Sequence, residues 1–399
     1  MVGTEVELDV TNIAHGGIAV ARLDGRVVFV SDAIPGERVR ARISSDSKKS
    51  FWRAETLAVL TPSEHRQPHV WREAALDRDP DDRAGGAEFG HITLAHQREL
   101  KRQVLADAMR RMAGIEFEGE VESIDDEPHG IGWRTRVRLH IDEAGRPGPF
   151  AARSHRVIPV TSLPLATTAI NDIAPFDERF EPGSTVDLLS LSTGGARLFY
   201  GNQKPSTITE IVGDRQFRLA DTGFWQVHRA AAVTLTKAVQ AAIDPELFDP
   251  RAANLDLYGG VGLLAAAVAD RFGPTTRITT VESDATATEY AGSNLAEYAG
   301  AQAVTGRVER WLASYPGGPR ARAATVILDP PRSGAGGAVI ESLVASAPAQ
   351  LVYVACDPVA FARDAKLLVD RGYRLRALRA FDLFPNTHHL EAVGSFSRD

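Results

Sequence analysis

In the second half of the chain, from Thr222 onward, short β-branched runs alternate with helical segments. LDLYGGVGLLAAAVAD has the pattern of a strand, a glycine turn and a helix, and ITTVE, ATVILD, LVYVAC and LEAVGSF follow as further strands. This alternation favours an α/β fold, a doubly wound, mostly parallel sheet with helices on both faces. Ligands of such sheets bind at the carboxyl ends of the strands, so residues that follow a strand are the first candidates for a functional site.

A chain of 399 residues is long for one domain and predicts two or three. Residues 1–62 hold short strands such as TEVELDV, RVVFV and ERVRARI between glycine turns, and favour a small, OB-like β-barrel. Residues 63–221 combine the amphipathic helix ITLAHQRELKRQVLADAMRRMAGI with the alternating strand RVRLHI, and indicate a central α+β domain. Residues 222–399 are predicted to form the doubly wound domain.

Composition excludes some classes of protein. Hydrophobic residues make up 44% and charged residues 24% of the chain, as in an ordinary globular protein with a buried core. No apolar run is long enough to span a membrane, and MVGTEVELDV lacks the features of a secretory signal, so we expect a cytoplasmic protein. The net charge of −7 gives no support to nucleic-acid binding, which would have to rest on local basic patches. No coiled-coil or repeat pattern is present, and we expect a monomer.

A glycine turn and two strand-end acids indicate a nucleotide-type cofactor. The glycines of LDLYGGVG, Gly260 and Gly262 among them, let the backbone turn tightly and approach a ligand. Glu282 ends the next strand about twenty residues further on, where an acid can bind ribose hydroxyls. A dinucleotide dehydrogenase would share these features. Asp329 in LDPPRSG distinguishes a methyltransferase from a dehydrogenase. An acid followed by two prolines at a strand end is typical of S-adenosylmethionine-dependent methyltransferases that act on nucleic-acid bases.

Cys356, in LVYVACDPVAFARD, is the only cysteine of the chain. A single cysteine forms neither an internal disulfide nor a cysteine metal cage. Its thiol is therefore either a small hydrophobic group or a nucleophile, and the surrounding motifs decide which.

The motifs FWQVH, LDLYGGVG, VES, LDPPRSG, VACDPVAFARD and FPNTHHLEAV occur in an order and spacing that resemble the RNA 5-methyluridine methyltransferases of the TrmA/RumA type. The pattern HGGIAVARLDGRVVFVSDAIPGERVRARI in front of them resembles the TRAM domain, an OB-like RNA-binding barrel. The resemblance covers nearly the whole chain. It implies a class I methyltransferase that uses S-adenosylmethionine to methylate carbon 5 of a uridine in structured RNA.

The resemblance also implies roles for single residues. Cys356 would be the nucleophile and Glu391, in the H-x-E motif, the proton acceptor. The positions that would bind S-adenosylmethionine are Gln226, Tyr258, Glu282 and Asp329, together with Gly260 and Gly262 of the glycine turn.

The chemistry requires these residue types. Carbon 5 of uracil is too weak a nucleophile until a thiolate adds to carbon 6, and a base must afterwards remove the proton on carbon 5. Because a thiolate is required, we expect an electropositive setting for Cys356, with Arg332 or Arg363 beside it. The uridine must leave its stack to reach the thiol, and Phe384 is a candidate to stack on it. His388 and His389, if adjacent on a strand, would point to opposite faces and could not share a metal ion.

The chain departs from the family in two ways that bear on function. Many relatives hold an iron–sulfur cluster on four cysteines, but here Ala84-Gly85-Gly86-Ala87 replaces C-G-G-C, and His69 and Leu163 stand near the other two sites. We predict no cluster and no metal, and a flexible acidic segment, DRDPDDRAGG, in its place. Gly259 replaces a common cysteine of the glycine strand, which should be harmless.

Asp357 replaces the usual Asn after the nucleophile. If its carboxylate faces the site, it would raise the pKa of the Cys356 thiol and change how a pyrimidine edge is recognised. This leaves two alternatives to a uridine enzyme open, an RNA cytosine-5 methyltransferase and a catalytically weak RNA-binding protein.

The substrate is predicted only by class. Arg332, Asp357, Arg134 and Arg136 are the expected substrate contacts. The TRAM-like barrel favours 23S ribosomal RNA over tRNA by analogy. The candidates for phosphate contacts are basic residues that can equally well lie on a solvated surface: Lys48, Lys49, Arg53, Arg134, Arg136 and Arg138.

Overall fold

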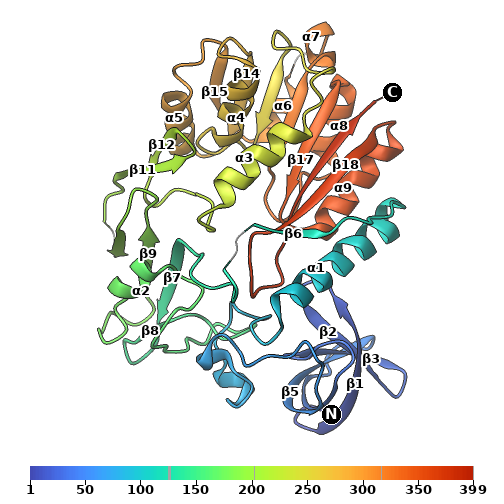
Figure 1. The fold of residues 1–399 in the computed structure, drawn as a ribbon, viewed down its shortest axis with the longest axis vertical. Helices are drawn as coiled ribbons and strands as arrows, with labels where there is room; N and C mark the ends of the chain where they lie inside the picture. Colours follow the sequence, from blue (N-terminus) through green and yellow to red (C-terminus); the bar gives the residue numbers. More distant parts are fainter. Residues whose placement is uncertain (125–126, 202, 316, 399) are drawn as a thin grey trace.

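The computed structural model describes residues 1–124, 127–201, 203–315 and 317–398. At the N-terminal end, five strands close into a barrel in the order β1-β2-β3-β5-β4 (Figure 1). Buried and exposed side chains alternate along β4, because successive residues of a strand point to opposite faces. The strands are β1 (Glu5–Ala14), β2 (Ile18–Leu23), β3 (Arg26–Ser31), β4 (Arg38–Ser45) and β5 (Phe51–Thr61).

The central region contains a four-stranded sheet in the order β10-β9-β7-β8 and a separate hairpin of β11 and β12. Its helical elements are η1 (Arg72–Ala74), η2 (Pro80–Asp82), α1 (Leu94–Ala108), the π-helical turn η3 (Met109–Ala113) and α2 (Thr168–Ile173). Its strands are β6 (Val121–Ser123), β7 (Arg136–Ile141), β8 (Pro147–Gly148), β9 (Thr185–Ser190), β10 (Ala196–Tyr200), β11 (Thr207–Val212) and β12 (Arg215–Ala220).

The C-terminal half is built on an eight-stranded sheet in the order β15-β14-β13-β16-β17-β19-β18-β6. Strands β13 to β17 pair in parallel, while β19 is antiparallel to both of its neighbours. The strands are β13 (Asn254–Leu257), β14 (Ile278–Glu282), β15 (Ala301–Thr305), β16 (Thr325–Leu328), β17 (Gln350–Ala355), β18 (Arg374–Asp382) and β19 (Glu391–Ser397). The helices are α3 (Ala231–Ala242), α4 (Leu263–Phe272), α5 (Ala285–Asn294), α6 (Val308–Ala313), α7 (Pro319–Arg322), α8 (Gly337–Ser346) and α9 (Pro358–Asp370).

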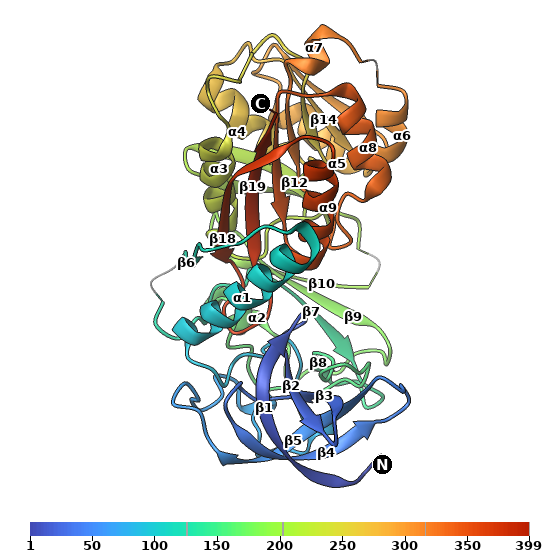
Figure 2. The same ribbon diagram turned by 90° about the vertical axis from the view of Figure 1, so that its right-hand side faces the viewer.

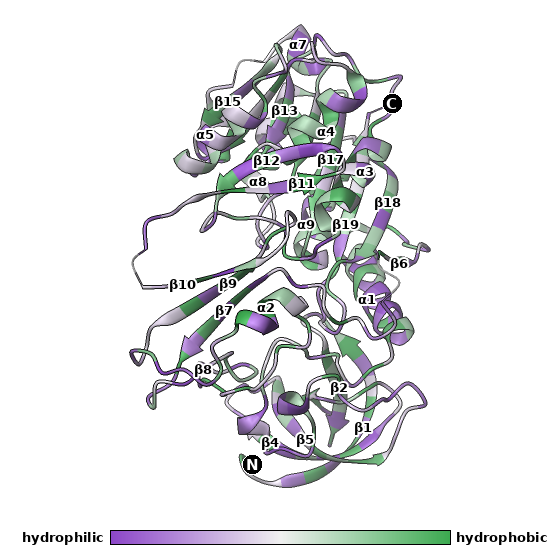
Figure 3. Ribbon diagram, turned by 60° about the vertical axis from the view of Figure 1, so that its left-hand side comes forward, coloured by the Kyte–Doolittle hydropathy of each residue, from purple (hydrophilic) through white to green (hydrophobic). Residues whose placement is uncertain are grey.

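Helices cover both faces of this sheet, with α3 and α4 on one side and α6, α8 and α9 on the other (Figure 2). Strand β17 shows why the sequence requires this. Its residues Val352 and Val354 pack with α3 and α4, while Leu351 and Tyr353 pack with α8 and α9. A strand that is apolar on both faces has to be covered on both. In Figure 3 the barrel strands change colour along their length, whereas α4 is largely hydrophobic, as burial of nearly the whole helix requires.

Helix α1 lies between the barrel and the C-terminal sheet (Figure 2) and contacts β1, α9 and β6. It passes into the π-helical turn and ends at Gly114, whose φ of +68° suits glycine. Strand β6, which follows, pairs with β18 and completes the edge of the C-terminal sheet.

The predicted α/β fold is confirmed, with its doubly wound sheet, its N-terminal barrel and a central sheet beside α2. The domain limits 1–62, 63–221 and 222–399 stay predictions, since β6 joins the C-terminal sheet from the central region. Among the described residues, the helices are too short or too polar for a membrane span.

Candidate active site

The register of two antiparallel strands brings the predicted nucleophile and base together. Ala355, at the end of β17, pairs with Ala392 of β19. Cys356 follows Ala355 and Glu391 precedes Ala392, so the two functional residues lie side by side at the same end of the sheet. Residues 35 positions apart in the sequence thus meet through a pairing that the sequence alone did not specify.

Cys356 and Glu391 line a cavity of about 1110 Å³ at the carboxyl ends of the parallel strands, hereafter the large cavity. Of the predicted site residues, all but Gly262, Arg136 and Asp357 line it: Arg134, Gln226, Tyr258, Gly260, Glu282, Asp329, Arg332, Cys356 and Glu391. Phe384, the predicted stacking residue, also lines it. Gly262 instead begins α4 with a φ of +90° and lies against Leu295, so its role is in the turn and in packing.

The glycine turn after β13 directs Tyr258 and Glu282 to this cavity. Tyr258 has a φ of +63°, which is rare for an aromatic residue and is a form of strain found at functional sites. The turn is held by the carbonyl of Val281, which accepts from both Tyr258 N and Gly259 N. The carboxylate of Glu282 accepts from Gly260 N at 3.1 Å and from Asp284 N at 2.9 Å. Glu282 is therefore fixed where a strand-end acid can bind hydroxyl groups.

Gly259 is required by its surroundings in this chain. A Cβ at this position would overlap Thr280 Oγ1 and lie 2.6 Å from Asp256 Oδ2. Thr280 itself donates to Asp256 at 3.0 Å. The neighbouring threonine thus fills the space that a larger residue at position 259 would need.

Three buried carboxyl groups with raised pKa values lie at this site: Asp329 and Glu391 line the cavity, and Asp256 is fully buried near Asp329. Burial raises the pKa of Asp256 to about 6. Burial and the charge of Asp256 raise the pKa of Asp329 to about 7. Burial and Asp329 raise the pKa of Glu391 well above its usual value, against the opposing charge of Arg332. A cationic ligand in the cavity would favour the ionised forms of these carboxyl groups and so lower their pKa values.

The expected electropositive setting of Cys356 is wrong. Burial, followed by the charges of Glu391 and Asp329, raises the pKa of the thiol to about 12, and Arg332 is the neighbour that opposes them. The other predicted cation, Arg363, is directed elsewhere, since it pairs with buried Asp364 and donates to the carbonyl of Ser333 at 2.7 Å. Of the two arginines, only Arg332 acts on the thiol.

The loop that leads into Glu391 is anchored by α1, which the sequence analysis did not foresee. Lys101 is fully buried and binds Asp382 at 2.6 Å and the carbonyl of Phe384 at 3.0 Å. Gln97, also buried, donates to Asn386 Oδ1 at 2.9 Å and accepts from Asn386 N at 2.7 Å. Helix α1 therefore positions the base. Two polar residues four positions apart, Gln97 and Lys101, on a helix face that otherwise buries Leu100, Leu105 and Ala108 were the available signal.

The adjacent histidines do not lie on a strand. His388 and His389 belong to this loop, ahead of β19, and their rings lie 3.9 Å apart instead of on opposite faces. Burial, with the charges of His388 and Arg332, lowers the pKa of His389 to about 3, so His389 is neutral at ordinary pH. Phe384 packs against His389, edge to face.

Asp357 does not face the large cavity. Its Oδ1 accepts from Val359 N and Ala360 N, which caps α9, and its Oδ2 lies 3.2 Å from His15 Nε2 of the barrel. Although burial opposes ionisation, these partners lower the pKa of Asp357. Its charge is the smallest of the causes that raise the pKa of the Cys356 thiol. The carboxylate is thus engaged by protein groups and not available to a pyrimidine edge.

We therefore expect Asp357→Asn to leave the choice of base unchanged, because the asparagine keeps the helix cap and still does not face the cavity. Nucleoside mass spectrometry of RNA treated with the variant should show 5-methyluridine and no 5-methylcytidine. A product that changed between the two bases would place Asp357 in base recognition after all.

The predicted basic contacts differ in their freedom to bind RNA. Arg134 lines the large cavity. Arg136 donates to the carbonyl of Gly223 at 2.6 Å and supports the segment that leads to Gln226. Arg138 pairs with Asp187 on the neighbouring strand, and Arg53 lies over the rings of Phe29 and Phe51. Lys48 and Lys49 are exposed on the barrel. Phosphate contacts by these residues stay predictions.

Phe224 is a cavity residue that the sequence analysis missed. Its side chain is 75% exposed at the edge of the large cavity, two residues before Gln226. An exposed aromatic ring beside a nucleotide-sized cavity can stack on a base. The aromatic residue in the motif FWQVH was the signal.

The region that holds a cluster in many relatives is packed differently here. Ala84, Ala87 and Leu163 are buried, and His69 accepts from Trp71 N and contacts the carbonyl of Ala87 at 3.1 Å. Within the described ranges, no group of three or more His, Cys, Asp or Glu side chains is placed to hold a metal ion. The absence of a cluster stays a prediction, and an iron–sulfur absorption band in anaerobically purified protein would contradict it.

The acidic segment DRDPDDRAGG, expected to be flexible, makes defined contacts in the structure, and its flexibility stays a prediction. Asp79 caps the turn η2 by accepting from Asp81 N at 3.0 Å. Buried Arg83 pairs with Asp32 of the barrel and donates to the carbonyls of Leu76 and Arg78. An arginine at the end of the acidic run fastens it to the barrel.

Comparison with known proteins agrees with this geometry. The TRAM domain model matches residues 1–55, and the tRNA (Uracil-5-)-methyltransferase model matches residues 320–398, which include Cys356 and Glu391. The crystal structure of the Pyrococcus abyssi tRNA (uracil-54, C5)-methyltransferase in complex with S-adenosyl-L-homocysteine has a TM-score of 0.70 and 21% identity, and covers 98% of this chain and 100% of its own.

Bacterial relatives match over the whole length. An uncharacterized RNA methyltransferase of Streptomyces avermitilis is 34% identical and covers 98% of both chains. Another, of Bifidobacterium longum, is 33% identical and covers 99% of this chain and 97% of its own. The chain belongs to the family of RNA uracil-5 methyltransferases.

Proposed function

We propose that this enzyme methylates carbon 5 of a uridine in structured RNA with S-adenosylmethionine, through a covalent bond between Cys356 and carbon 6. The observation that carries the proposal is the register of β17 and β19, which sets Cys356 beside Glu391 on the wall of a cavity lined by strand-end acids. We propose that it acts as a cytoplasmic monomer.

The large cavity fits the cofactor in size and charge. Its volume of about 1110 Å³ exceeds that of a usual small-ligand pocket, which leaves room for a nucleotide beside the cofactor. Glu282 would hold the ribose hydroxyls, and Tyr258 and Gln226 line the same cavity. The excess of carboxyl groups around Asp329 suits a ligand that carries a sulfonium and an ammonium group.

The affinity for S-adenosylmethionine should therefore rise with pH. A cationic ligand binds the ionised form of Asp329, whose pKa is about 7 in the free chain, so the affinity should increase about tenfold between about pH 6 and about pH 8. Isothermal titration calorimetry measures this directly, and Asp329→Asn should flatten the dependence. An affinity that is constant or falls over this range would contradict the charge argument.

The residues of the chain perform the covalent chemistry. The thiolate of Cys356 bonds to carbon 6, and the electrons of the C5–C6 double bond move toward the O4 carbonyl to give an enolate. When bound, S-adenosylmethionine supplies the electrophilic methyl group that carbon 5 accepts. The carboxylate of Glu391 then takes the proton from carbon 5, and the freed electrons restore the double bond and expel the thiolate.

Two groups must ionise for these steps. In the free chain both the Cys356 thiol and Glu391 have raised pKa values. Arg332 lowers the pKa values of both groups, and the positive charge of a cationic ligand in the cavity would lower them further. The raised pKa of Glu391 makes it a stronger base once ionised.

Ribosomal RNA is the substrate class we propose, with tRNA as the alternative. The TRAM domain supports ribosomal RNA by analogy, whereas the Pyrococcus abyssi enzyme, which matches the full chain, is named for uracil 54 of tRNA. Nucleoside mass spectrometry of both RNA classes, from cells with and without the gene, tests the proposal. Loss of 5-methyluridine from one class names the substrate.

The same measurement decides the two alternatives. Loss of 5-methylcytidine would make the enzyme a cytosine methyltransferase, and no change in either nucleoside would favour an RNA-binding protein without activity. The engagement of Asp357 by His15 and α9 removes the reason for expecting cytosine.

A further inference from the structure

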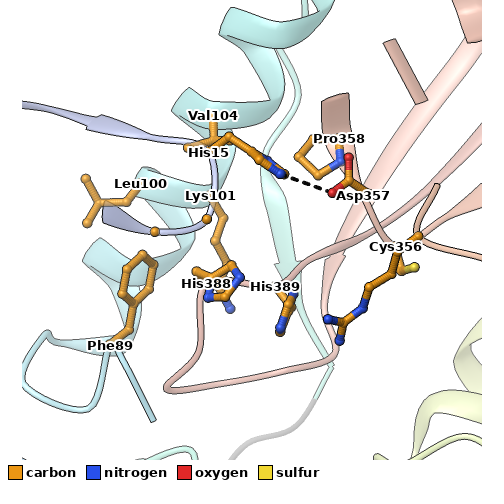
Figure 4. Close-up of a pocket in the computed structure, with 13 residues that line it drawn as sticks. His15, Phe89, Leu100, Lys101, Val104, Cys356, Asp357, Pro358, His388 and His389 are labelled. Carbon is orange, nitrogen blue, oxygen red and sulfur yellow. Dashed lines mark ion pairs between the residues drawn. The ribbon is translucent and has the colours of Figure 1, made fainter. Parts of the chain in front are cut away.

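The turn between β1 and β2 of the barrel, formed by His15, Gly16 and Gly17, reaches into the C-terminal domain. It contacts two loops there, one that follows Cys356 and one that leads into Glu391. Hereafter these are the nucleophile loop and the base loop. Figure 4 shows His15 directed at Asp357, with His388 and His389 on the other side of the same space.

The contact with the nucleophile loop is an ion pair. His15 Nε2 lies 3.2 Å from Asp357 Oδ2, and Asp357 is bonded directly to Cys356 in the chain. The other oxygen of Asp357 caps α9 through Val359 N at 3.0 Å and Ala360 N at 2.8 Å. His15 therefore binds Asp357, the residue that connects Cys356 to α9.

The contact with the base loop is a close approach of backbone. A Cβ at Gly17 would overlap Cβ of His388 and lie 3.0 Å from a ring carbon of Phe89. The ring of His388 packs, tilted, against that of His389, which stands two residues before Glu391, and His388 Nδ1 lies 3.6 Å from Glu88 Oε2. Gly17 also has a φ of +69°, so both its conformation and its neighbours require glycine.

Between these contacts lies a second, smaller cavity of about 150 Å³. The barrel turn forms one wall of it, and Cys356, Arg332 and His389 line both this cavity and the large one. Cys356 thus lies between the two cavities, and the barrel turn bounds the smaller one on the opposite side. The nucleophile lies beside a turn that stands some 340 residues earlier in the sequence.

We propose that His15 and Gly17 are positioning residues of the catalytic site, which hold the nucleophile loop and the base loop in register with each other. The barrel then has a second role beside RNA binding, since catalysis by Cys356 and Glu391 depends on its docked turn. The activity part of this inference rests on the function proposed above.

A matched pair of glycine substitutions tests the inference. Gly25, in the turn between β2 and β3, has a φ of +80°, and a Cβ at this position would have no atom within 4 Å. Gly25→Ala therefore introduces the same kind of backbone strain as Gly17→Ala, but without an overlap like that of Gly17 with His388. We expect Gly17→Ala to lower the single-turnover methylation rate at least about tenfold, with the Kd for RNA within about twofold of the unchanged chain. Gly25→Ala should keep both values. The substrates are ribosomal RNA and tRNA from cells that lack the gene.

A second measurement does not depend on the RNA. The rate at which iodoacetamide alkylates Cys356, the only cysteine, reports how well the nucleophile loop is held. We expect Gly17→Ala and His15→Ala to raise this rate at least about threefold, because the loosened loop exposes the thiol. His15→Gln, whose amide can still donate to Asp357, should restore the slow rate, and His155→Ala, an exposed histidine of the central region, should have no effect.

The outcomes separate the inference from the proposed function. Faster alkylation in an enzyme that methylates neither RNA class would retain the positioning role and refute the function. Unchanged alkylation with weaker RNA binding would make the turn an RNA contact and overturn the inference, and so would unchanged values in every assay. If Gly17→Ala does not fold, the three histidine variants decide.

Discussion

Replacing Cys356 with alanine should abolish the formation of 5-methyluridine, with a loss of at least about 10⁴-fold in the single-turnover rate. Without the sulfur no bond to carbon 6 can form, and carbon 5 stays too weak a nucleophile to accept a methyl group. The chain contains no other cysteine that could take over. Transfer of tritiated methyl groups to RNA measures the loss.

The same variant should still bind S-adenosylmethionine within about twofold of the normal affinity, because Tyr258, Glu282 and Asp329 keep their places at the ends of strands β13, β14 and β16. This control separates lost chemistry from a lost fold. A Cys356→Ala variant that retained a tenth of the rate would rule out covalent catalysis by this residue.

Glu391→Gln should stop the reaction later and trap the RNA on the protein. The thiolate can add and carbon 5 can be methylated, but no carboxylate remains to remove the proton from carbon 5, so the adduct accumulates. We expect a loss of about 10²- to 10⁴-fold in turnover, together with a protein–RNA band that survives denaturing electrophoresis. Glutamine matches the shape of the buried glutamate, which limits damage to the fold.

The matched control is Glu289→Gln, which makes the same change on the exposed side of α5 and should neither slow turnover nor trap RNA. A Glu391→Gln variant that turned over normally would assign the base to another residue. One that lost activity without a trapped adduct would move Glu391 to a step before methyl transfer.

Most of the residues predicted to bind the cofactor come together in the large cavity for a physical reason, and their contact with the cofactor stays a prediction. Glu282 is the last residue of a short strand, and Tyr258 and Asp329 each directly follow one. Parallel strands bring their carboxyl ends to one edge of the sheet. The strand pattern therefore explains why these residues line one cavity, although Tyr258 was identified by resemblance. It could not distinguish Gly262, which serves the turn, from Gly260, which lines the cavity.

The substrate side of the site could be predicted only in part. Cys356 and Glu391 were identified by resemblance. The carboxylates that raise the pKa of the thiol lie at or next to the ends of three different strands, β16, β17 and β19. Their combined effect on the thiol could not be predicted, because the sequence does not show that these strand ends meet. Arg363 was expected beside the thiol to stabilise a thiolate, yet its position on α9 directs it to Asp364 and Ser333. Contacts of α1 and the barrel with the catalytic loops join residues nearly 300 or more positions apart, which only the fold reveals.

Asp357 shows how the fold changes the meaning of a substitution. Considered as a neighbour of Cys356, it was expected to disturb the thiol or alter the choice of base. In the structure one oxygen of its carboxylate caps the first turn of α9, and the other pairs with His15 of the barrel. The unusual residue beside the nucleophile therefore serves the contact between two domains.

The covalent step is the central claim, and RNA that contains 5-fluorouridine tests it most directly. Fluorine at carbon 5 cannot leave as the proton does, so the reaction should halt after methyl transfer with Cys356 still bonded to carbon 6. Mass spectrometry of the digested complex should then find the peptide of Cys356 carrying a methylated fluorouridine. A chain that makes 5-methyluridine from normal RNA, but leaves this peptide unmodified with the fluorinated RNA, would contradict the covalent mechanism.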